Sequence, residues 1–320
     1  MEDIKGAAKS AAQAVTVHDL MEAVNQVLLD KADVVELTTV CLVSGGHVLL
    51  EDVPGVGKTT LAKVLARALG ASFRRIQFTS DMLPADVIGV SVFERTRGQF
   101  TFNPGPIFAQ MVLADEINRT PPRTQSALLE AMSEGQVTVD NETRALPQPY
   151  FVIATQNPLE LHGTYPLPES QMDRFMMSLS MGYPSDLVER SVIVQEEDRS
   201  RLEAVPVVAS PEILQAWRAA SQTPAVKDEV VGYIQSILKG TRDSEEVLLG
   251  ASPRAGIQLF RAVRALAWVR GRSFATPDDV RSLAPHVLSH RLWLHGERSG
   301  GRRAQARNVL MKIVESVPLP

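Results

Sequence analysis

A segment in the first quarter of the chain has the residue types and spacing of a phosphate-binding loop. It reads Glu-Asp-Val-Pro-Gly-Val-Gly-Lys-Thr-Thr over residues 51–60, between an apolar run and a helical pattern. Its glycines let backbone N–H groups turn inward around the β- and γ-phosphates without Cβ clashes. The lysine would place a charge on the phosphate oxygens, the first threonine would give its hydroxyl to Mg²⁺, and the following helix would point its positive end at the phosphates. The sequence therefore predicts a nucleoside triphosphate site formed by Asp52, Val53, Pro54, Gly55, Val56, Gly57, Lys58, Thr59 and Thr60.

The first position of this motif departs from the usual pattern Gly-x-x-x-x-Gly-Lys-Ser/Thr, because Asp52 stands in place of glycine. Aspartate tolerates left-handed backbone better than most residues, and the segment has the required strand-loop-helix context. The alternative is an ordinary glycine-containing turn with a surface lysine. We favour the phosphate-binding interpretation.

Two acidic residues could add hydrolysis to nucleotide binding, which needs a metal ligand and a group that positions water. Asp115 and Glu116 directly follow the apolar run 111–114, which is typical of a buried parallel strand. The strand would deliver Asp115 to the carboxyl edge of the sheet, beside Thr59 and Mg²⁺. Glu116 would then orient or deprotonate the attacking water. An Asp-Glu pair after an apolar run is a weak signal alone, but it becomes strong after a phosphate loop.

Three further polar residues are candidates for the same site. Asn157 follows the predicted strand 150–154 and would hydrogen-bond the water or the γ-phosphate; its alternative is a turn-forming residue before Pro158. Arg174 precedes the predicted strand 176–181, and Arg254 opens the longest helix of the C-terminal part. Both could neutralise charge that develops on the phosphate, whereas a lone arginine is usually a solvated surface residue.

The order of predicted elements indicates an α/β fold. Strands alternate with helices up to residue 181, which predicts a parallel sheet covered by helices on both faces. Only helical patterns remain from residue 185, so we expect a nucleotide-binding domain at 1–184, with N-terminal helices, and a helical lid at 185–320. The lid core is expected to use the stripe Ile257, Phe260, Val263, Leu266 and Trp268. Two insertions interrupt the first domain, a hairpin or loop at 93–102 and a β-hairpin at 136–146 that turns at Asp140-Asn141.

Composition limits the partners and the compartment. The formal net charge is −4 and the pI is near 5.9, so the chain has no overall electrostatic footprint for nucleic acid. The single cysteine, Cys41, lies in an apolar helical pattern, which excludes an internal disulfide framework and favours a small buried residue. The N-terminus lacks the features of a signal peptide, and no segment has 18 uninterrupted apolar residues. We therefore expect a cytoplasmic protein without a membrane segment.

Two weaker patterns lie near the C-terminus. His286 and His290 are four residues apart, a spacing that could hold a metal, but no third ligand is evident and a lid-surface or core position is favoured. A polar break is expected at 296–301, before a final helix. A basic stretch there is interpreted as a solvated helix face and comprises Arg298, Arg302, Arg303 and Arg307.

Four segments together resemble the MoxR family of AAA+ ATPases, and the likeness runs from about residue 20 to about residue 290. They span residues 49–59, 113–132, 154–158 and 250–254, and Asp52 in place of glycine is the form that this family uses. The resemblance implies a sensor-1 role for Asn157, an arginine-finger role for Arg174 and a sensor-2 role for Arg254. Arg119 and Arg123 also lie near the subunit interface that the resemblance implies.

The family is similar to magnesium-chelatase ATPase subunits, forms rings that are usually hexamers, and often works with von Willebrand factor A-domain proteins. The resemblance therefore implies a Mg²⁺-dependent ATPase whose ATP hydrolysis drives chaperone-like remodelling or maturation of a partner protein. A nucleic-acid motor is disfavoured by the negative charge and by hairpin 136–146, where Arg144 is set against Asp140 and Glu142. A nucleotide-gated scaffold without hydrolysis is disfavoured by Glu116. A transcription activator would normally carry a Gly-Ala-Phe-Thr-Gly-Ala-type loop, which the sequence lacks.

Overall fold

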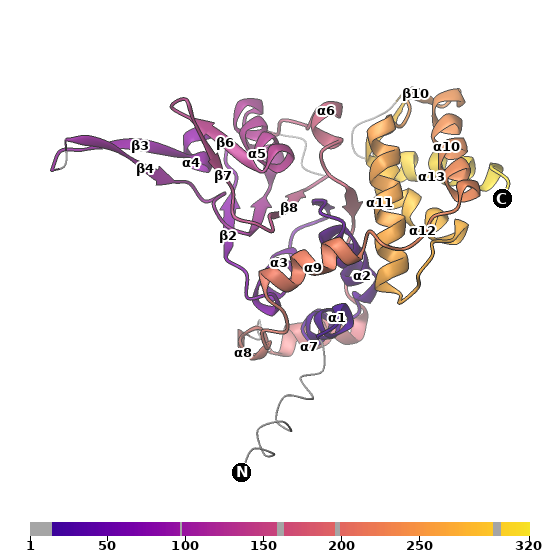
Figure 1. Cartoon of the computed structure of the whole chain (residues 1–320), viewed down its shortest axis with the longest axis horizontal. Coiled ribbons are helices and arrows are strands. Elements are labelled where there is room, and N and C mark those ends of the chain that lie inside the picture. Colours follow the sequence, from indigo (N-terminus) through magenta and orange to yellow (C-terminus); the bar gives the residue numbers. More distant parts are fainter. Residues whose placement is uncertain (1–14, 97, 159–162, 196–198, 297–301) are drawn as a thin grey trace, which may run out of the picture.

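A parallel β-sheet forms the centre of the fold. The computed structural model describes residues 15–96, 98–158, 163–195, 199–296 and 302–320. Within them, five parallel strands pair in the order β2-β5-β8-β1-β9, so the predicted α/β class is confirmed (Figure 1). The strands are β1 (Val48–Glu51), β2 (Phe73–Gln77), β5 (Met111–Asp115), β8 (Phe151–Gln156) and β9 (Met177–Leu179).

Alternating side chains of each central strand pack against opposite layers. Leu50 and Leu113 join one hydrophobic cluster, whereas Leu49 and Val112 join a second cluster on the other face. This alternation follows from the two-residue period of a strand. The first cluster includes side chains of α1 (Val17–Asn25), α2 (Ala32–Val43) and α3 (Lys58–Ala68), and the second includes side chains of α4 (Pro84–Ile88) and α5 (Pro122–Glu134).

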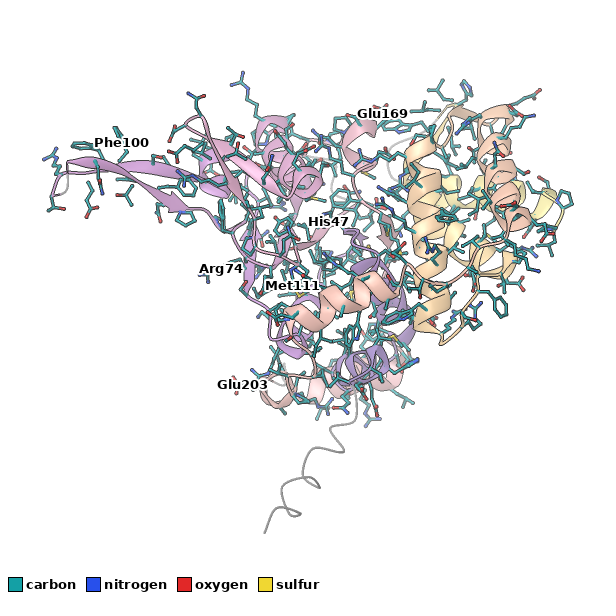
Figure 2. All side chains as sticks on the ribbon, viewed as in Figure 1. His47, Arg74, Phe100, Met111, Glu169 and Glu203 are labelled. Carbon is teal, nitrogen blue, oxygen red and sulfur yellow. The ribbon has the colours of Figure 1, made fainter. Side chains whose placement is uncertain are left out.

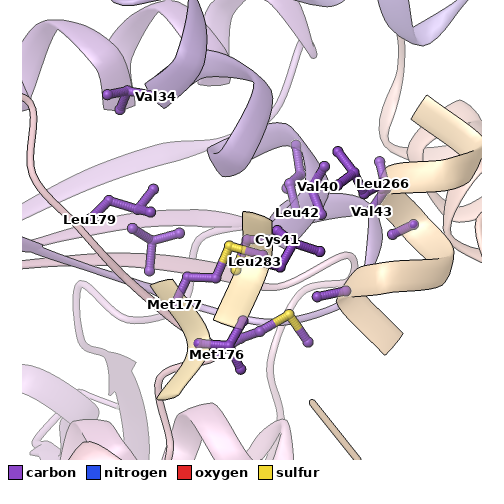
Figure 3. Close-up of a cluster of buried hydrophobic side chains, with 14 of the residues drawn as sticks. Val34, Val40, Cys41, Leu42, Val43, Met176, Met177, Leu179, Leu266 and Leu283 are labelled. Carbon is purple, nitrogen blue, oxygen red and sulfur yellow. The ribbon is translucent and has the colours of Figure 1, made fainter. Parts of the chain in front are cut away.

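Buried aliphatic side chains join α2, β9 and the C-terminal helices, as Figure 3 shows. Cys41 lies in this cluster beside Leu283 and is fully buried, which confirms it as a small core residue. Burial raises the pKa of its thiol, so the sulfur stays protonated and unreactive.

Serine and threonine caps start three of the C-terminal helices. Ser210, Ser252 and Thr276 each accept a hydrogen bond from the backbone N–H three residues later. The helices of this part are α7 (Asp186–Gln195), α8 (Arg199–Ala204), α9 (Pro211–Ala220), α10 (Asp228–Asp243), α11 (Pro253–Val269), α12 (Pro277–Leu288) and α13 (Arg302–Ser316). Short turns complete the described elements: α6 (Glu169–Met172), η1 (Ile117–Arg119) and η2 (Ser289–Arg291).

The C-terminal part is not purely helical, contrary to the prediction. Strands β10 (Val247–Leu249) and β11 (Trp293–Leu294) form an antiparallel pair. Runs of two or three residues are too short to show a period of two, and the partner strand lies far along the chain, so only tertiary pairing reveals them.

The predicted lid stripe is wrong at Ile257, which is 55% exposed, whereas Leu259 of the same helix is fully buried. The buried face of α11 also contains Ala262, Val263 and Leu266. Ile257 lies on the opposite side of the helix because two residues correspond to about 200° of rotation.

The interpretation of the basic stretch as a solvated helix face is wrong at Arg303. Its Nη1 donates to the carbonyl oxygens of Leu179 at 3.0 Å and Glu51 at 3.3 Å, and it pairs with the Glu51 carboxylate at 3.3 Å. A carboxylate and carbonyls gathered at the ends of β1 and β9 need such a cation when they are buried. Arg307 is exposed as predicted, whereas Arg298 and residues 297–301 of the predicted break lie outside the described residues.

Segments that follow residue 184 contact the first domain. The N–H groups of Val208 and Ala209 both donate to the carbonyl oxygen of Ala68 in α3, at 2.8 and 3.0 Å, and α9 packs on α2. Helices α10 to α13 group together on one side of the molecule (Figure 1). The division at residue 184 therefore stays a prediction. No helix in the described ranges combines the length and apolar composition that a membrane span requires.

Both insertions are antiparallel hairpins. Strands β3 (Gly89–Glu94) and β4 (Gln99–Pro104) form the first, which projects far from the body of the molecule (Figure 1). A Cβ on Gly89 would lie 2.4 Å from the carbonyl oxygen of Asn103, so the base of this hairpin requires glycine. Strands β6 (Gln136–Val139) and β7 (Glu142–Ala145) form the second. Its turn is confirmed at Asp140 and Asn141, whose φ angles are 53° and 63°.

We expect His47 to make the stability of the fold depend on pH. Its Nδ1 accepts the Val152 N–H at 3.0 Å and its Nε2 lies 3.1 Å from the Met132 carbonyl oxygen, an arrangement that suits the neutral ring. Burial lowers the pKa of His47 from 6.5 to about 4. The resulting stability is fully present above pH 6.5 and is lost as the pH falls through about 4.

Urea unfolding at pH 7.5 and pH 5 tests this. The wild type should lose about 2 kcal/mol more unfolding free energy over this range than His47→Gln, since only the wild-type side chain takes up a proton on unfolding. Equal losses in the two proteins would contradict the assignment. His286 and His290 are present in both, so they cancel in the comparison.

Candidate active site

A cavity of about 580 Å³ lies at the carboxyl edge of the sheet. The phosphate loop forms one side of it. Its wall contains Asp115 at the end of β5, Glu116 directly after it, and Asn157 directly after β8. Apolar side chains come from another segment, because the connection between α1 and α2 contributes Leu28 and Leu29. Such a combination of polar groups and apolar walls is typical of a site for a phosphorylated ligand with a flat base.

The phosphate loop has the backbone shape that the sequence predicts. Gly55 and Gly57 adopt φ angles of 85° and 96°, a region that L side chains rarely occupy. Helix α3 begins at Lys58, so its first N–H groups face the cavity edge. The Lys58 ammonium donates to the carbonyl oxygens of Asp52 at 2.8 Å and Val53 at 3.2 Å. Burial lowers the pKa of Lys58, and the nearby carboxylates of Asp52, Asp115 and Glu116 oppose that shift.

Asp52 has a different role from the one expected of it. It is absent from the residues with positive φ, so tolerance of left-handed backbone does not explain its presence. Its carboxylate instead accepts the N–H of Met181, the N–H of Gly182 at 3.4 Å and the hydroxyl of Ser180 at 3.1 Å. Asp52 therefore ties the start of the phosphate loop to the segment after β9, and it does not line the cavity.

Thr155 holds both predicted acidic residues, and the sequence analysis missed it. Its hydroxyl donates to Asp115 Oδ1 at 2.6 Å and accepts the backbone N–H of Glu116 at 2.9 Å. Glu116 has φ 56° and ψ 49°, a left-handed conformation that costs about 1–3 kcal/mol for a side chain of this kind. A polar residue near the end of an otherwise apolar strand was the available signal.

Strand β2 also contributes two residues that the sequence analysis missed. The Gln77 amide donates to Glu116 Oε2 at 2.9 Å, and Arg119 lies 3.1 Å from the same oxygen. Arg75 pairs with Asp115 Oδ2 at 2.6 Å. Both acidic side chains are therefore held by neighbours, which fixes their orientation in the cavity wall.

The oxygen atoms of Thr59 and Asp115 fit a magnesium ion. Both residues line the cavity, and hydroxyl and carboxylate oxygens are the ligands that Mg²⁺ takes from proteins, with phosphates and waters as the others. In the described part of the chain, no three His, Cys, Asp or Glu side chains gather as a metal site.

Of the histidine pair, His290 is part of the core and His286 is half-buried. The Nε2 of His290 lies 3.1 Å from the carbonyl oxygen of Phe175. Burial lowers the pKa of both rings, that of His286 to about 4. The favoured interpretation, a core or lid position, agrees with this burial.

The structure places two of the predicted site residues away from the cavity of their own chain. Arg174 donates to the carbonyl oxygen of Leu129 and, at 2.9 Å, to the hydroxyl of Ser133 on α5. The Nε of Arg254 lies 3.9 Å from Asp173, and its side chain is 51% exposed. Neither arginine lines the cavity, whereas Asn157 does.

Comparison with known proteins defines the class. Residues 47–177 match the family of ATPases associated with various cellular activities, and residues 239–309 match the AAA lid domain. A crystal structure of a protein from Cytophaga hutchinsonii, assigned as an ATPase, superposes with a TM-score of 0.85 at 33% identity and covers 95% of this chain and 94% of that one. The fold and the cavity are those of an AAA+ ATPase with a lid.

Two relatives show to which family of AAA+ ATPases the chain belongs. Chaperone MoxR1 of Mycobacterium tuberculosis is 38% identical over 324 residues, with 98% of this chain and 85% of the relative covered. The uncharacterized protein YeaC of Bacillus subtilis is 47% identical over 301 residues, which cover 94% and 93% of the two chains. Magnesium-chelatase subunits match at lower identity. The chain belongs to the MoxR family of AAA+ ATPases, which confirms the resemblance seen in the sequence.

Proposed function

We propose that this protein hydrolyses ATP with Mg²⁺ and uses the energy to remodel or mature a partner protein. The observation that carries the proposal is one cavity that gathers the phosphate loop, Asp115, Glu116 and Asn157. A switch without hydrolysis would not need a carboxylate beside the phosphate site. The orientation of Glu116 by Thr155 and Gln77 favours an enzyme over a nucleotide-gated scaffold.

Each side chain has a role that its position supports. The loop N–H groups and Lys58 hold the β- and γ-phosphates, and Lys58 exchanges its loop carbonyl partners for phosphate oxygens. Thr59 and Asp115 hold Mg²⁺, which neutralises phosphate charge when bound. Glu116 accepts a proton from the attacking water or orients it. Asn157 donates to that water or to the γ-phosphate.

An arginine from a neighbouring subunit neutralises the charge that develops on the phosphate during hydrolysis. Arg174 follows Asp173 in sequence, and Asp173 contacts Arg254 at 3.9 Å and Arg291 at 2.9 Å, so Arg174 and Arg254 belong to one region outside the cavity. Such a region serves as the donor of arginine groups if it faces the cavity of the next copy in a ring. We therefore propose a ring homo-oligomer, with a hexamer as the expected size. Arg123 is exposed and stays an alternative finger, whereas Arg119 pairs with Glu116 of its own chain.

The β3–β4 hairpin is the proposed surface for client proteins. Phe93 and Phe100 are 51% and 73% exposed and stack on each other with ring centroids 5.3 Å apart. Figure 2 shows Phe100 on the projecting end of the hairpin. Phe102 instead packs against Phe108 and lies under the guanidinium of Arg144, so it fixes the hairpin base. Exposed aromatic groups of this kind mark interaction sites.

Substitution of these two aromatic residues tests the client surface. Phe93→Ser/Phe100→Ser should leave ATP affinity within about threefold of normal, because neither residue lines the cavity, and should reduce the proteins that co-purify with a Glu116→Gln form by about tenfold. Leu248→Ser is the control, since that side chain is 63% exposed elsewhere. Unchanged co-purification in the double variant would contradict the proposal.

A test of the second hairpin should spare those of its residues that pack into the core. Val137 and Leu146 are 7% and 3% exposed and belong to the second hydrophobic cluster, so exchange of the whole segment would open the core. Val139 also packs against this cluster, so only residues 140–143 should be replaced when the role of the hairpin is tested. The von Willebrand factor A-domain partner and the cytoplasmic location stay predictions, and the pairing of Arg144 with Glu142 gives no support to nucleic-acid binding.

A further inference from the structure

Arg75 is a cation in the candidate active site to which the proposed function assigns no role. It lies on β2 and lines the same cavity as the phosphate loop. Its Nη2 and Nε donate to Asp115 Oδ2 at 2.6 and 3.1 Å. The Arg75 side chain is 47% exposed, whereas that of Asp115 is 12% exposed. The pair therefore joins a half-exposed cation to a carboxylate fixed in the cavity wall.

The two oxygen atoms of Asp115 have different partners. Oδ1 accepts the hydroxyl of Thr155 at 2.6 Å in a buried bond, so this oxygen is committed to the protein interior. Oδ2 is the oxygen that the guanidinium of Arg75 holds. A divalent cation at Asp115 would share Oδ2 with a positive group, and two cations so close repel each other.

A second contact shows that Arg75 is held at this position from two sides. Its Nη2 also donates to Gln77 Oε1 at 2.7 Å. The neighbouring Arg74 is exposed, and none of the hydrogen bonds or ion pairs found among the described residues involves its side chain. Arg74 precedes Arg75 on the same edge strand, β2 (Figure 2). The two arginines therefore have the same charge at adjacent positions but differ in their contacts.

We propose that Arg75 competes with Mg²⁺ for Asp115 and thereby sets the Mg²⁺ concentration that the site needs. This inference rests on the proposed function. The guanidinium of Arg75 neutralises Asp115 as its ion-pair partner, and it leaves Oδ2 when a divalent cation and a triphosphate enter together. Arg75 is a positioning residue, since it acts through Asp115.

The test measures ATP binding to the Glu116→Gln form at increasing MgCl₂, so that hydrolysis does not interfere. Arg75→Gln should lower the half-saturating Mg²⁺ concentration by about three- to tenfold, the range expected for a partly exposed ion pair. Arg75→Lys keeps the charge but loses the planar guanidinium. Its half-saturating Mg²⁺ concentration should therefore lie between that of Arg75→Gln and that of the parent, which is the protein with Glu116→Gln alone. Arg74→Gln removes the same charge from the same strand and should stay within about twofold of the parent.

The outcomes separate this inference from the proposed function. A parent protein that binds no ATP at any Mg²⁺ concentration overturns the proposed function. Normal ATP binding with an unchanged or raised half-saturation in Arg75→Gln overturns only the role of Arg75. If Arg75→Gln does not fold, Arg75→Lys decides: a half-saturation below that of the parent supports competition, and an equal one overturns it. An equal decrease in Arg74→Gln would show a general charge effect and would also overturn it.

Discussion

Glu116→Gln should bind ATP with near-normal affinity and lose at least about 100-fold in ATP turnover. The amide has the size of the carboxylate, and the backbone N–H of residue 116 keeps its bond to Thr155, so the cavity wall is preserved. An amide cannot accept the proton of the attacking water at neutral pH. Steady-state phosphate release and equilibrium ATP binding measure the two effects separately.

Two comparisons sharpen this prediction. Lys58→Ala should lose ATP binding itself, because it removes the charge that holds the phosphates. Glu134→Gln makes the same chemical change at an exposed position at the end of α5 and should leave both binding and turnover unchanged. Turnover of Glu116→Gln within a few-fold of the wild type would show that another group activates the water.

Arg174→Ala should be inactive alone but should regain ATP turnover when it is mixed with inactive Lys58→Ala protein. In a mixed ring, some sites combine an intact phosphate loop from one copy with an intact Arg174 from its neighbour. An arginine finger contributes about 10³- to 10⁵-fold to turnover, so the recovered activity should stand well above that of either protein alone. The measurement is phosphate release across mixing ratios, with assembly monitored by light scattering.

Arg174 also has contacts within its own chain, and the control must account for them. Its bond to the Ser133 hydroxyl measures 2.9 Å. Ser133→Ala removes that partner and leaves the arginine in place, so this variant should keep ATP turnover. If no mixing ratio restores activity although both proteins assemble, Arg174 does not act in the neighbouring site.

Several features of the protein could be predicted from short stretches of sequence. The phosphate loop depends on glycines and a lysine at fixed separations, and Asp115, Glu116 and Asn157 each follow a strand that its apolar residues identify. Parallel strands of one sheet end at the same edge, so these local patterns were enough to predict that the residues meet.

Other features depended on contacts between distant parts of the chain. The partners of Asp52 lie far along the chain, after β9, and those of Asp115 come from β2 and β8 on either side of β5. Arg303 is half-buried because the ends of β1 and β9 gather around it. The nucleotide site, the acidic pair and the family could be read from the chain without a structure, because their signals are local. The groups that hold those residues, and the position of Arg174 and Arg254 outside the cavity, emerged only after folding, because such contacts depend on strand order.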